Sequence, residues 1–216
     1  MLHKETVGKG TLELLKTLMN DPLLDNFFLV GGTALSLQIG HRKSIDLDLF
    51  SLSDFDENAL LEATEKKYGF YMDFQSKNTL KGQINGIKVD FITHQYPLIH
   101  PLLLIEDVRM AGLSDIAAMK LNAIAGNGTR TKDFIDIAYL SSFLTTKQIV
   151  DAYQNKYSTR NPVMAIKSMV YHRDIDFAEP VEMMDENYSW KEIEKRLNEM
   201  LDAPERLFKP LSKQKN

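Results

Sequence analysis

The sequence contains no cysteine in its 216 residues. Disulfide bonds, thiolate metal sites and cysteine nucleophiles are therefore excluded. No apolar run approaches the roughly 20 residues that a membrane-spanning helix needs, and the N-terminal MLHKETVGKG lacks the apolar core of a signal peptide. We therefore expect a cytoplasmic protein without a membrane partner.

A basic excess is missing as well, because the formal net charge is −4 at pH 7. This argues against a protein that coats nucleic acid over its whole surface, although a local basic cluster could still bind it. Apolar residues make up 44% of the chain and charged residues 26%, which is typical of a soluble globular protein. The length suits one large domain or two small ones.

The segment Leu29–Ser51 carries the most informative pattern, LVGGTALSLQIGHRKSIDLDLFS. Its acidic part, Ile45–Phe50, alternates acidic and apolar residues as a strand does, so Asp46 and Asp48 should project from the same face. The opposite face, which we expect to enter a core, carries Ile45, Leu47 and Leu49. Two like charges held side by side need a positive partner, and a divalent cation is a common one.

The order of predicted elements indicates an α+β fold. The expected helices of the first half are Thr11–Asn20, Thr33–Ile39 and Asp56–Tyr68. The expected strands are Phe27–Val30, Ile45–Phe50, Phe70–Gln75, Thr79–Ile84 and Ile87–Thr93. Asn85-Gly86 joins the last two strands and is a strong hairpin signal. This half therefore predicts a mixed sheet with an antiparallel edge.

Pro97 and Pro101 mark a change, and beyond Ser114 the sequence predicts helices only. Ser114 is expected to cap the first of them, and these helices are Asp115–Ala125, Lys132–Phe143, Thr146–Tyr157, Pro162–His172 and Trp190–Leu201. We predict an α/β domain over residues 1–100 and a helical domain over residues 101–216 that completes an active-site cleft, with a boundary near residues 95–106. The polar tail from Lys209 is expected to fray.

Asp90 adds a third carboxylate on a neighbouring strand. Asp46, Asp48 and Asp90 together could bind one or two Mg²⁺ ions, which prefer oxygen ligands. In a two-metal site, one ion lowers the pKa of an attacking hydroxyl and the other neutralises the leaving pyrophosphate. The plainer alternative for these carboxylates is the solvated face of an edge strand.

Gly31-Gly32-Thr33 lies between a predicted strand and a predicted helix. Glycine lets backbone amides approach phosphate oxygens, and a helix N-terminus adds partial positive charge. The Thr33 hydroxyl could donate a further hydrogen bond. Many strand–helix turns contain glycine, so the pattern gains weight only from the Asp-x-Asp that follows it.

His41-Arg42-Lys43-Ser44 directly precedes the acidic strand. Arg42 or Lys43 could contact a triphosphate or a nucleic-acid backbone, and Ser44 could orient either. The alternative is that these residues only balance the carboxylates and cap the strand, which we favour for His41.

Lys120 lies on an otherwise apolar helix surface, where it either extends to solvent or grips a phosphate from the helical half. Asp133 and Asp136 are one helical turn apart and share a face. Asp136 could orient Lys120 or act as a base. A basic rim could receive RNA, and its candidates are Arg130, Lys132, Lys156, Arg160, Lys167 and Arg173.

GGTALSLQIGHRKSIDLDLF resembles the first motif of the AbiEii/AbiGii-type toxins, a branch of the DNA polymerase β-like nucleotidyltransferase superfamily. Ile87–Phe91 resembles the position of the superfamily's third carboxylate, and Asp115–Ile124 and Arg130–Ile137 resemble the helical motifs of the branch. The turn departs from many members, because Thr33 stands where they have serine.

The resemblance implies a polymerase β-like fold and Mg²⁺-dependent transfer of a nucleoside monophosphate from an NTP to an acceptor. Some members modify the 3′ end of tRNA and are neutralised by a cognate antitoxin. By position, the resemblance implies that Gly32 and Thr33 hold phosphates, that Asp46 and Asp48 hold metal, that Lys120 takes the triphosphate and that Asp136 is the essential aspartate of the last motif.

Two other functions remain open at this stage. One is a kinase-like phosphoryl transfer to a protein partner in the same cleft, which would move the γ-phosphate instead of the nucleotidyl group. The other is a non-catalytic nucleotide-binding or antitoxin-like module, which would bind NTP without turnover.

Overall fold

The computed structural model describes residues 1–185 and 188–211. In this part of the chain no helix is long and apolar enough to cross a membrane. The chain forms two compact units. The sheet unit comprises Met1–Gly40, Ser44–Pro97 and Pro101–Ala111, and the helical unit comprises His41–Lys43, Leu98–His100 and Gly112–Asn216. The last five residues of the polar tail, 212–216, lie outside the described residues.

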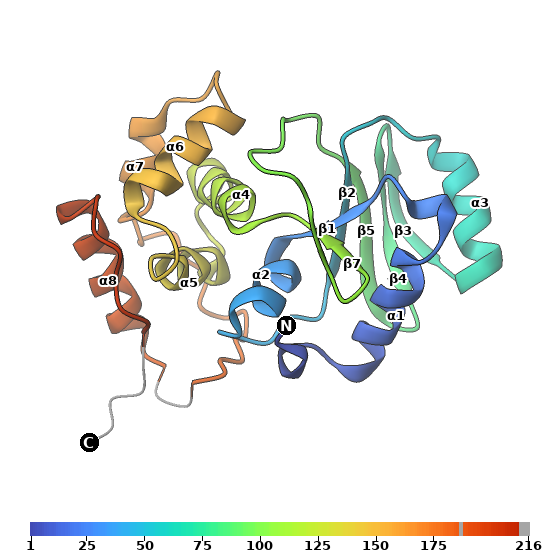
Figure 1. The fold of residues 1–216 in the computed structure, drawn as a ribbon, viewed down its shortest axis with the longest axis horizontal. Helices are drawn as coiled ribbons and strands as arrows, with labels where there is room; N and C mark the ends of the chain where they lie inside the picture. The colour runs from blue at the N-terminus through green and yellow to red at the C-terminus, as the bar shows by residue number, and fades with distance from the viewer. Residues whose placement is uncertain (186–187, 212–216) are drawn as a thin grey trace. The chain divides into compact units, whose positions relative to one another are not determined.

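The sheet unit contains a seven-stranded mixed sheet in the order β3-β4-β5-β2-β1-β7-β6 (Figure 1). The strands are β1 (Phe28–Val30), β2 (Leu47–Ser51), β3 (Tyr71–Ser76), β4 (Thr79–Ile84), β5 (Ile87–Thr93), β6 (Leu103–Ile105) and β7 (Val108–Met110). β2 runs parallel to β5 and β1 runs parallel to β7, whereas the other neighbours are antiparallel. The predicted α+β class with a mixed sheet is confirmed.

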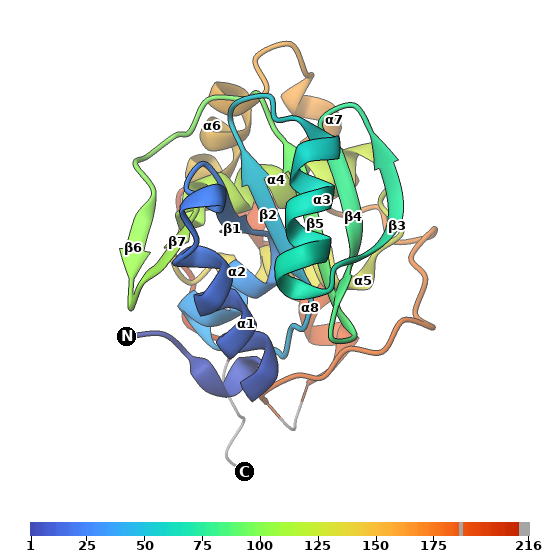
Figure 2. The same ribbon diagram turned by 90° about the vertical axis from the view of Figure 1, so that its right-hand side faces the viewer.

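Three α-helices, α1 (Lys9–Met19), α2 (Gly31–Ile39) and α3 (Glu57–Tyr68), accompany the sheet. Figure 2 shows α1 and α3 in front of the strands, and α3 contacts β3 and β4. Phe91 of β5 packs edge-to-face against Phe27 and Phe70, with ring centroids 5.2 and 6.0 Å away. These aromatic contacts fill the core beneath β5.

The helical unit consists of α4 (Leu113–Gly126), α5 (Thr131–Leu140), α6 (Thr146–Lys156), α7 (Pro162–Ser168) and α8 (Trp190–Asp202). α4 packs against α5, α6 and α7, and α5 packs against α8. All five helices were predicted. Gly112, not Ser114, occupies the N-cap of α4, and α7 ends four residues before the predicted His172.

Lys156 corrects one prediction for this unit. Its side chain is fully buried, and Nζ lies 2.8 Å from Asp115 Oδ1. Asp115 also accepts hydrogen bonds from the backbone N–H groups of Ile99 and His100. Lys156 is therefore an internal cation that holds segment 98–100 on α4, and it does not belong to a basic rim on the surface.

Two predictions for the sheet unit also need correction. β2 begins at Leu47, and the Ile45 side chain, expected in the core, is 67% exposed. The β6–β7 hairpin was not predicted, because its turn contains Glu106 and Asp107 at φ of 52° and 67°. A tight hairpin turn favours positive φ at both central residues, which usually selects asparagine and glycine.

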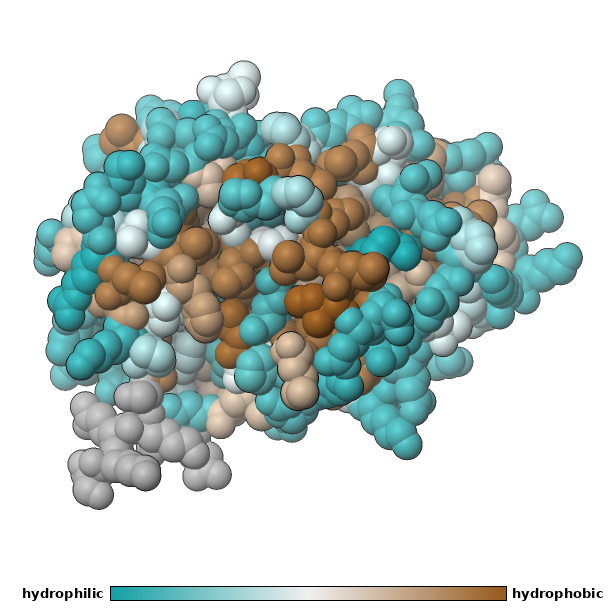
Figure 3. Space-filling model, viewed as in Figure 1, coloured by the Kyte–Doolittle hydropathy of each residue, from teal (hydrophilic) through white to brown (hydrophobic). Residues whose placement is uncertain are grey.

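Hydrophilic residues cover much of the face drawn in Figure 3, and groups of hydrophobic residues interrupt them. Some exposure of apolar side chains is normal for a folded protein.

Candidate active site

Two of the three predicted carboxylates are neighbours in the sheet. Asp48 on β2 is the register partner of Asp90 on β5. Adjacent strands lie about 4.8 Å apart and register partners project from the same face, so the two carboxylates share one side of the sheet. Asp90 is 2% exposed, whereas Asp48 is half-buried.

Asp46 lies immediately before β2 and is half-buried, as Asp48 is. The described residues contain no group of three or more histidine, aspartate or glutamate side chains placed to hold a metal ion. The structure thus brings Asp48 and Asp90 together as register partners. The three-carboxylate metal site stays a prediction.

The two oxygens of Asp90 have different surroundings. Lys81, the register partner of Asp90 on β4, places Nζ 2.9 Å from Oδ2, and Lys88 Nζ lies 3.7 Å from the same oxygen. Asp90 Oδ1 is buried and has no hydrogen-bond partner among the described residues. A buried anionic oxygen without a donor is unfavourable, and a cation bound between Asp48 and Asp90 would satisfy it. The donor set therefore fits Mg²⁺, which prefers carboxylate oxygens.

Gly31 gives room to the Asp48 carboxylate. It is the first residue of α2 and has φ of +71°. A Cβ atom at this position would collide with Asp48 Oδ2. Glycine is thus required both by the left-handed backbone and by the approach of the carboxylate. Gly32 follows in the first turn of α2, and its predicted contact with phosphate stays a prediction.

Thr33 uses its hydroxyl inside the protein. The residue is 1% exposed, and the hydroxyl donates to the Asp46 carbonyl at 2.5 Å. It also shares a 2.9 Å hydrogen bond with the Ser44 hydroxyl. These bonds tie the start of α2 to the segment that enters β2. The structure therefore supports a role for Thr33 and Ser44 in positioning the Asp46–Asp48 segment, and their predicted contact with phosphate stays a prediction.

The helical unit contains a buried charge network around Asp136 on α5, whose side chain is fully buried. Arg42 Nε donates to Asp136 Oδ1 at 2.7 Å and Nη2 donates to Oδ2 at 2.9 Å. Lys120 Nζ lies 2.8 Å from Asp136 Oδ2 and donates to Asp133 Oδ1 at 2.6 Å. His41 Nε2 lies 2.7 Å from Asp136 Oδ1.

The charge states of this network follow from burial and from the neighbours. Burial alone would raise the pKa of Asp136, but the charges of Arg42 and Lys120, with hydrogen bonds from Arg42 and His41, hold that pKa well below its usual range. Burial would also lower the pKa of Lys120, yet Asp136 and Asp133 raise it. Asp136 is therefore a permanent anion and a poor general base.

His41 is the neutral member of the network. Burial lowers its pKa, and this outweighs the opposing effect of Asp136. A neutral imidazole that bonds Asp136 carries its proton on Nε2 and donates it. The expected role of His41 as a simple strand cap is thereby replaced by a buried hydrogen bond to Asp136.

The sequence profile of the nucleotidyl transferase AbiEii toxin family, a type IV toxin–antitoxin system, matches residues 13–214. The chain belongs to this family. A protein of Aquifex aeolicus (strain VF5) is 33% identical over 192 residues, which cover 86% of this chain and 91% of the relative. Family membership makes the protein a nucleotidyltransferase, as the first motif indicated.

Solved structures share the fold of this AbiEii family member. MenT4, a nucleotidyltransferase toxin of Mycobacterium tuberculosis H37Rv, matches with a TM-score of 0.57 and 15% identity over 87% of this chain and 81% of that one. A Helicobacter pylori protein described as a nucleotidyltransferase matches with a TM-score of 0.53 and 17% identity, over 90% and 94% of the two chains.

Three side chains of this AbiEii family member were missed or undervalued in the sequence. Lys81 becomes informative only when β4 is paired with β5, and Asp133 only when α4 is packed against α5. His41 carries a signal that could have been used, since it lies beside the arginine of a specific motif. Arg42 itself donates hydrogen bonds from Nε and Nη2 to Asp136 and from Nη1 to the Lys43 carbonyl. This pairing disfavours its predicted contact with phosphate.

Proposed function

We propose that this AbiEii-type enzyme transfers a nucleoside monophosphate from an NTP to the 3′ hydroxyl of an RNA, with a tRNA acceptor end as substrate. The reaction uses Mg²⁺, takes place in the cytoplasm and is restrained by a cognate antitoxin. The observation that carries the proposal is the pairing of Asp48 with Asp90, whose buried Oδ1 lacks a donor among the described residues.

The proposed transfer balances simply. The 3′ hydroxyl of the RNA loses its proton to solvent water as its oxygen attacks the α-phosphorus. The bond from the α-phosphorus to the bridging oxygen breaks, and pyrophosphate leaves in line with the attacking oxygen. Mg²⁺ bound by Asp48 and Asp90, with Asp46 as a further ligand, would lower the pKa of the attacking hydroxyl and neutralise the leaving group. Lys81 binds Asp90 through Oδ2, and Gly31 leaves the space that the Asp48 carboxylate occupies.

Of the residues that the sequence suggested for phosphate binding, Gly32 and Lys120 are kept and Arg42 is not. Gly32, in the first turn of α2, offers a backbone N–H at a helix N-terminus. Lys120 keeps one of its three N–H donors beyond those directed at Asp133 and Asp136. Arg42 is assigned to the support of Asp136. Asp136 in turn orients Lys120, because a carboxylate with so low a pKa does not accept the hydroxyl proton.

RNA is supported as the acceptor by the resemblance to the family and by the surface of the helical unit. Exposed cations there include Arg130, Arg160, Lys167 and Arg173. Such residues attract a phosphate backbone even though the whole chain is acidic.

The experiment incubates the protein with each α-labelled NTP, Mg²⁺ and total tRNA. We expect wild type to label RNA with at least one NTP, and Asp48→Asn to lose that label while it keeps the wild-type circular dichroism spectrum. Labelling by neither protein with all four nucleotides would overturn the proposal.

Label from a γ-labelled NTP, transferred to protein, would indicate a kinase instead. Binding of NTP without any transfer, and without growth arrest on expression, would indicate a non-catalytic module.

A further inference from the structure

Two aromatic side chains of the edge strand β3 are exposed. Tyr71 is 67% exposed and Phe74 is 52% exposed. Among the described residues neither ring makes a hydrogen bond or a contact with another aromatic ring. Aromatic side chains usually bury most of their surface, so two bare rings on one short strand indicate a surface that a ligand covers.

Both rings lie on the face of the sheet that carries Asp48 and Asp90, which we call the carboxylate face. Phe74 is the register partner of Lys81, and Lys81 is the register partner of Asp90. Asp90 is in turn the partner of Asp48. Register partners share a face, so one row of side chains crosses the sheet from Phe74 to Asp48. Tyr71 pairs with β4 two positions from Lys81 and therefore joins the same face.

The register also gives the spacing of the rings. Neighbouring strands lie about 4.8 Å apart, so Phe74 is anchored about 10 Å from Asp90 and about 14 Å from Asp48. Tyr71 and Phe74 are anchored about 7 Å apart along β3, because their partners on β4 are two residues apart. Carbon atoms in contact lie about 3.5–4.0 Å apart, so one flat ring fits between two rings that stand upright on the sheet at this spacing.

A β-bulge in β3 favours a ligand that contacts the rings over a protein strand that extends the sheet. The register shifts between Met72 and Phe74, which leaves Asp73 as an extra residue. A bulge interrupts the regular row of backbone N–H and C=O groups with which an added strand would pair. Around the rings the carboxylate face carries polar side chains such as Lys81 and Gln83, whereas the centre of a protein interface is depleted of charge.

The cations near the rings suit a phosphate backbone. The side chains of Lys81 and Lys88 are 38% and 55% exposed, and Lys77 is exposed in the turn that joins β3 to β4. The anions at this edge are Asp73 and Asp90, so cations are in excess before any metal ion binds. Aromatic rings that stack bases, next to cations that attract phosphates, are typical of sites for single-stranded nucleic acid.

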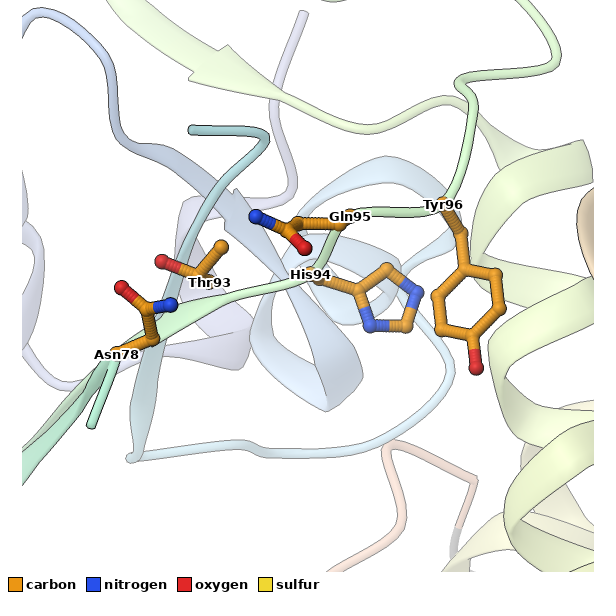
Figure 4. Close-up of a pocket in the computed structure, with 5 residues that line it drawn as sticks. All are labelled: Asn78, Thr93, His94, Gln95 and Tyr96. Atoms are coloured by element: carbon orange, nitrogen blue, oxygen red, sulfur yellow. The ribbon is translucent and has the colours of Figure 1, made fainter. Parts of the chain in front are cut away.

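The hairpin that carries both rings is anchored at its turn. Asn78 and Gln95 both donate an amide N–H to Asp54 Oδ1, at 2.7 and 2.5 Å, and the Thr93 N–H donates to the Asn78 carbonyl at 2.9 Å. Figure 4 shows Asn78, Thr93 and Gln95 close together at the end of β5, where they line a hollow of about 400 Å³. A hairpin that is already anchored loses less conformational entropy when a ligand binds to it.

We propose that Tyr71 and Phe74 form a stacking site for an unpaired base of the acceptor RNA, upstream of its reacting 3′ end. The inference rests on the proposed function and deepens it, because it names the surface on which the acceptor lies. Successive nucleotides of a stacked strand advance about 3.4 Å, so the stacked base lies roughly three to four steps from the reacting end.

The experiment uses 2-aminopurine, whose fluorescence is quenched when it stacks. A single-stranded RNA of about 12 nucleotides carries it either three to four steps from the 3′ end or at the 5′ end, and the protein is titrated into each RNA without NTP. We expect stronger quenching with the first RNA. Tyr71→Ala and Phe74→Ala should each reduce this quenching and raise Kd roughly 5- to 150-fold, as expected for loss of one base–aromatic stack.

Tyr71→Phe and Phe74→Tyr retain the rings and should quench as wild type does. The matched control is Leu104→Ala, because Leu104 is an apolar residue with similar exposure, 69%, on the edge strand β6 at the other end of the sheet. Its Kd should equal that of wild type. The inference is overturned by the absence of quenching with both RNAs, or by equal Kd for wild type, Tyr71→Ala and Phe74→Ala.

Two further measurements test other ligands for the rings. Quenching of 2-aminopurine riboside triphosphate that depends on Phe74 would assign the rings to the NTP and overturn their assignment to the acceptor. Sedimentation velocity tests a protein ligand. A wild-type dimer that Phe74→Ala converts to a monomer, with RNA binding unchanged, would assign the rings to a second copy of this chain and also overturn the inference.

Nucleotidyl transfer is measured in parallel and separates the two proposals. Transfer without ring-dependent quenching would leave the proposed function standing and remove the stacking site. Ring-dependent quenching without transfer to any acceptor would support the stacking site and remove the proposed function. If both proposals hold, Phe74→Ala should raise KM for RNA and keep kcat, because the ring lies away from the reacting atoms.

Discussion

Arg42 holds both oxygens of Asp136, with Nε 2.7 Å from Oδ1 and Nη2 2.9 Å from Oδ2. The same carboxylate accepts His41 and Lys120, so one buried anion binds three side chains that could otherwise point elsewhere. His41 and Arg42 belong to the segment His41–Lys43, which is part of the helical unit, whereas the residues directly before and after this segment belong to the sheet unit. The pair with Asp136 is the contact that fixes this segment to α5.

Asp136→Asn is therefore expected to destabilise the protein by about 3–5 kcal/mol, because it leaves Arg42 buried without its charged partner. Urea denaturation measures the change in the free energy of unfolding. The control is Asp151→Asn, which removes the carboxylate of the exposed pair between Lys147 and Asp151 on α6 and should leave stability within error of wild type. Equal midpoints for the two variants would contradict the network described here.

The pH dependence of stability should report His41. Its folded-state pKa is lowered by burial, so the unfolded chain binds a proton at a pH at which the folded protein does not. The groups that face it are Asp136, Arg42, Lys120 and the ring of Tyr139. Its contribution to stability is present above the unfolded pKa of about 6.5 and is lost as the pH falls toward the lower folded pKa.

His41→Gln should flatten this dependence between about pH 7 and pH 5, since glutamine does not titrate. The measurement is urea denaturation across that interval. The control is His3→Gln, because His3 has a half-exposed side chain in the sheet unit. A slope in His41→Gln as steep as that of wild type would assign the effect to another group.

Local pattern predicted most elements of the fold. Asn85 and Gly86 adopt φ of 51° and 77° in the predicted hairpin turn, because asparagine and glycine tolerate a left-handed backbone better than other residues do. Glu106 and Asp107 also adopt positive φ, but this residue pair is not the asparagine–glycine pair that is typical of tight hairpin turns. The hairpin of β6 and β7 was therefore not predicted from the sequence. In that turn the pairing of β6 with β7 decides the conformation more than residue type does.

The candidate site was predicted only in part, because local patterns reveal single residues but not the partners that tertiary packing brings to them. Alternation placed Asp48 on one face of a strand, but its alignment with Asp90 depends on parallel pairing across about forty residues of chain. Spacing put Asp133 and Asp136 on one helix face, yet the Arg42 partner of Asp136 is 94 residues away in sequence. Chemistry that is local to one element is visible in the sequence, and partners brought by tertiary packing are not.

Gly31→Ala is expected to cost about 1–2 kcal/mol for the left-handed backbone alone. It should also move the Asp48 carboxylate, because the new Cβ would occupy the space of Oδ2. A displacement of about 1 Å can reduce turnover on the order of 100-fold. Thermal denaturation and nucleotidyl transfer are measured on the same preparation.

Gly69→Ala is the matched control for this substitution. Gly69 ends α3 with φ of +66° and has open space where a Cβ would stand. It should lose a similar amount of stability and keep its transfer rate. Similar loss of transfer in both variants would mean that contact with Asp48 is not what requires glycine at position 31.

Lys81→Met should make the protein more responsive to Mg²⁺. Lys81 supplies the closest positive charge to Asp90, 2.9 Å from Oδ2, and without it Asp48 and Asp90 remain as neighbouring carboxylates. The variant should melt at a lower temperature than wild type in EDTA, and Mg²⁺ should raise its melting temperature by more than it raises that of wild type. A gain of 1 kcal/mol corresponds to about 2–4 °C for a chain of this size.

Lys77→Met is the control, because Lys77 is an exposed lysine of the same unit between β3 and β4. Its melting temperature should respond to Mg²⁺ as that of wild type does. If Lys81→Met and Lys77→Met respond equally, the ammonium of Lys81 does not compete with a cation for Asp90. The proposal that a metal ion satisfies the buried Oδ1 of Asp90 would then lose its support.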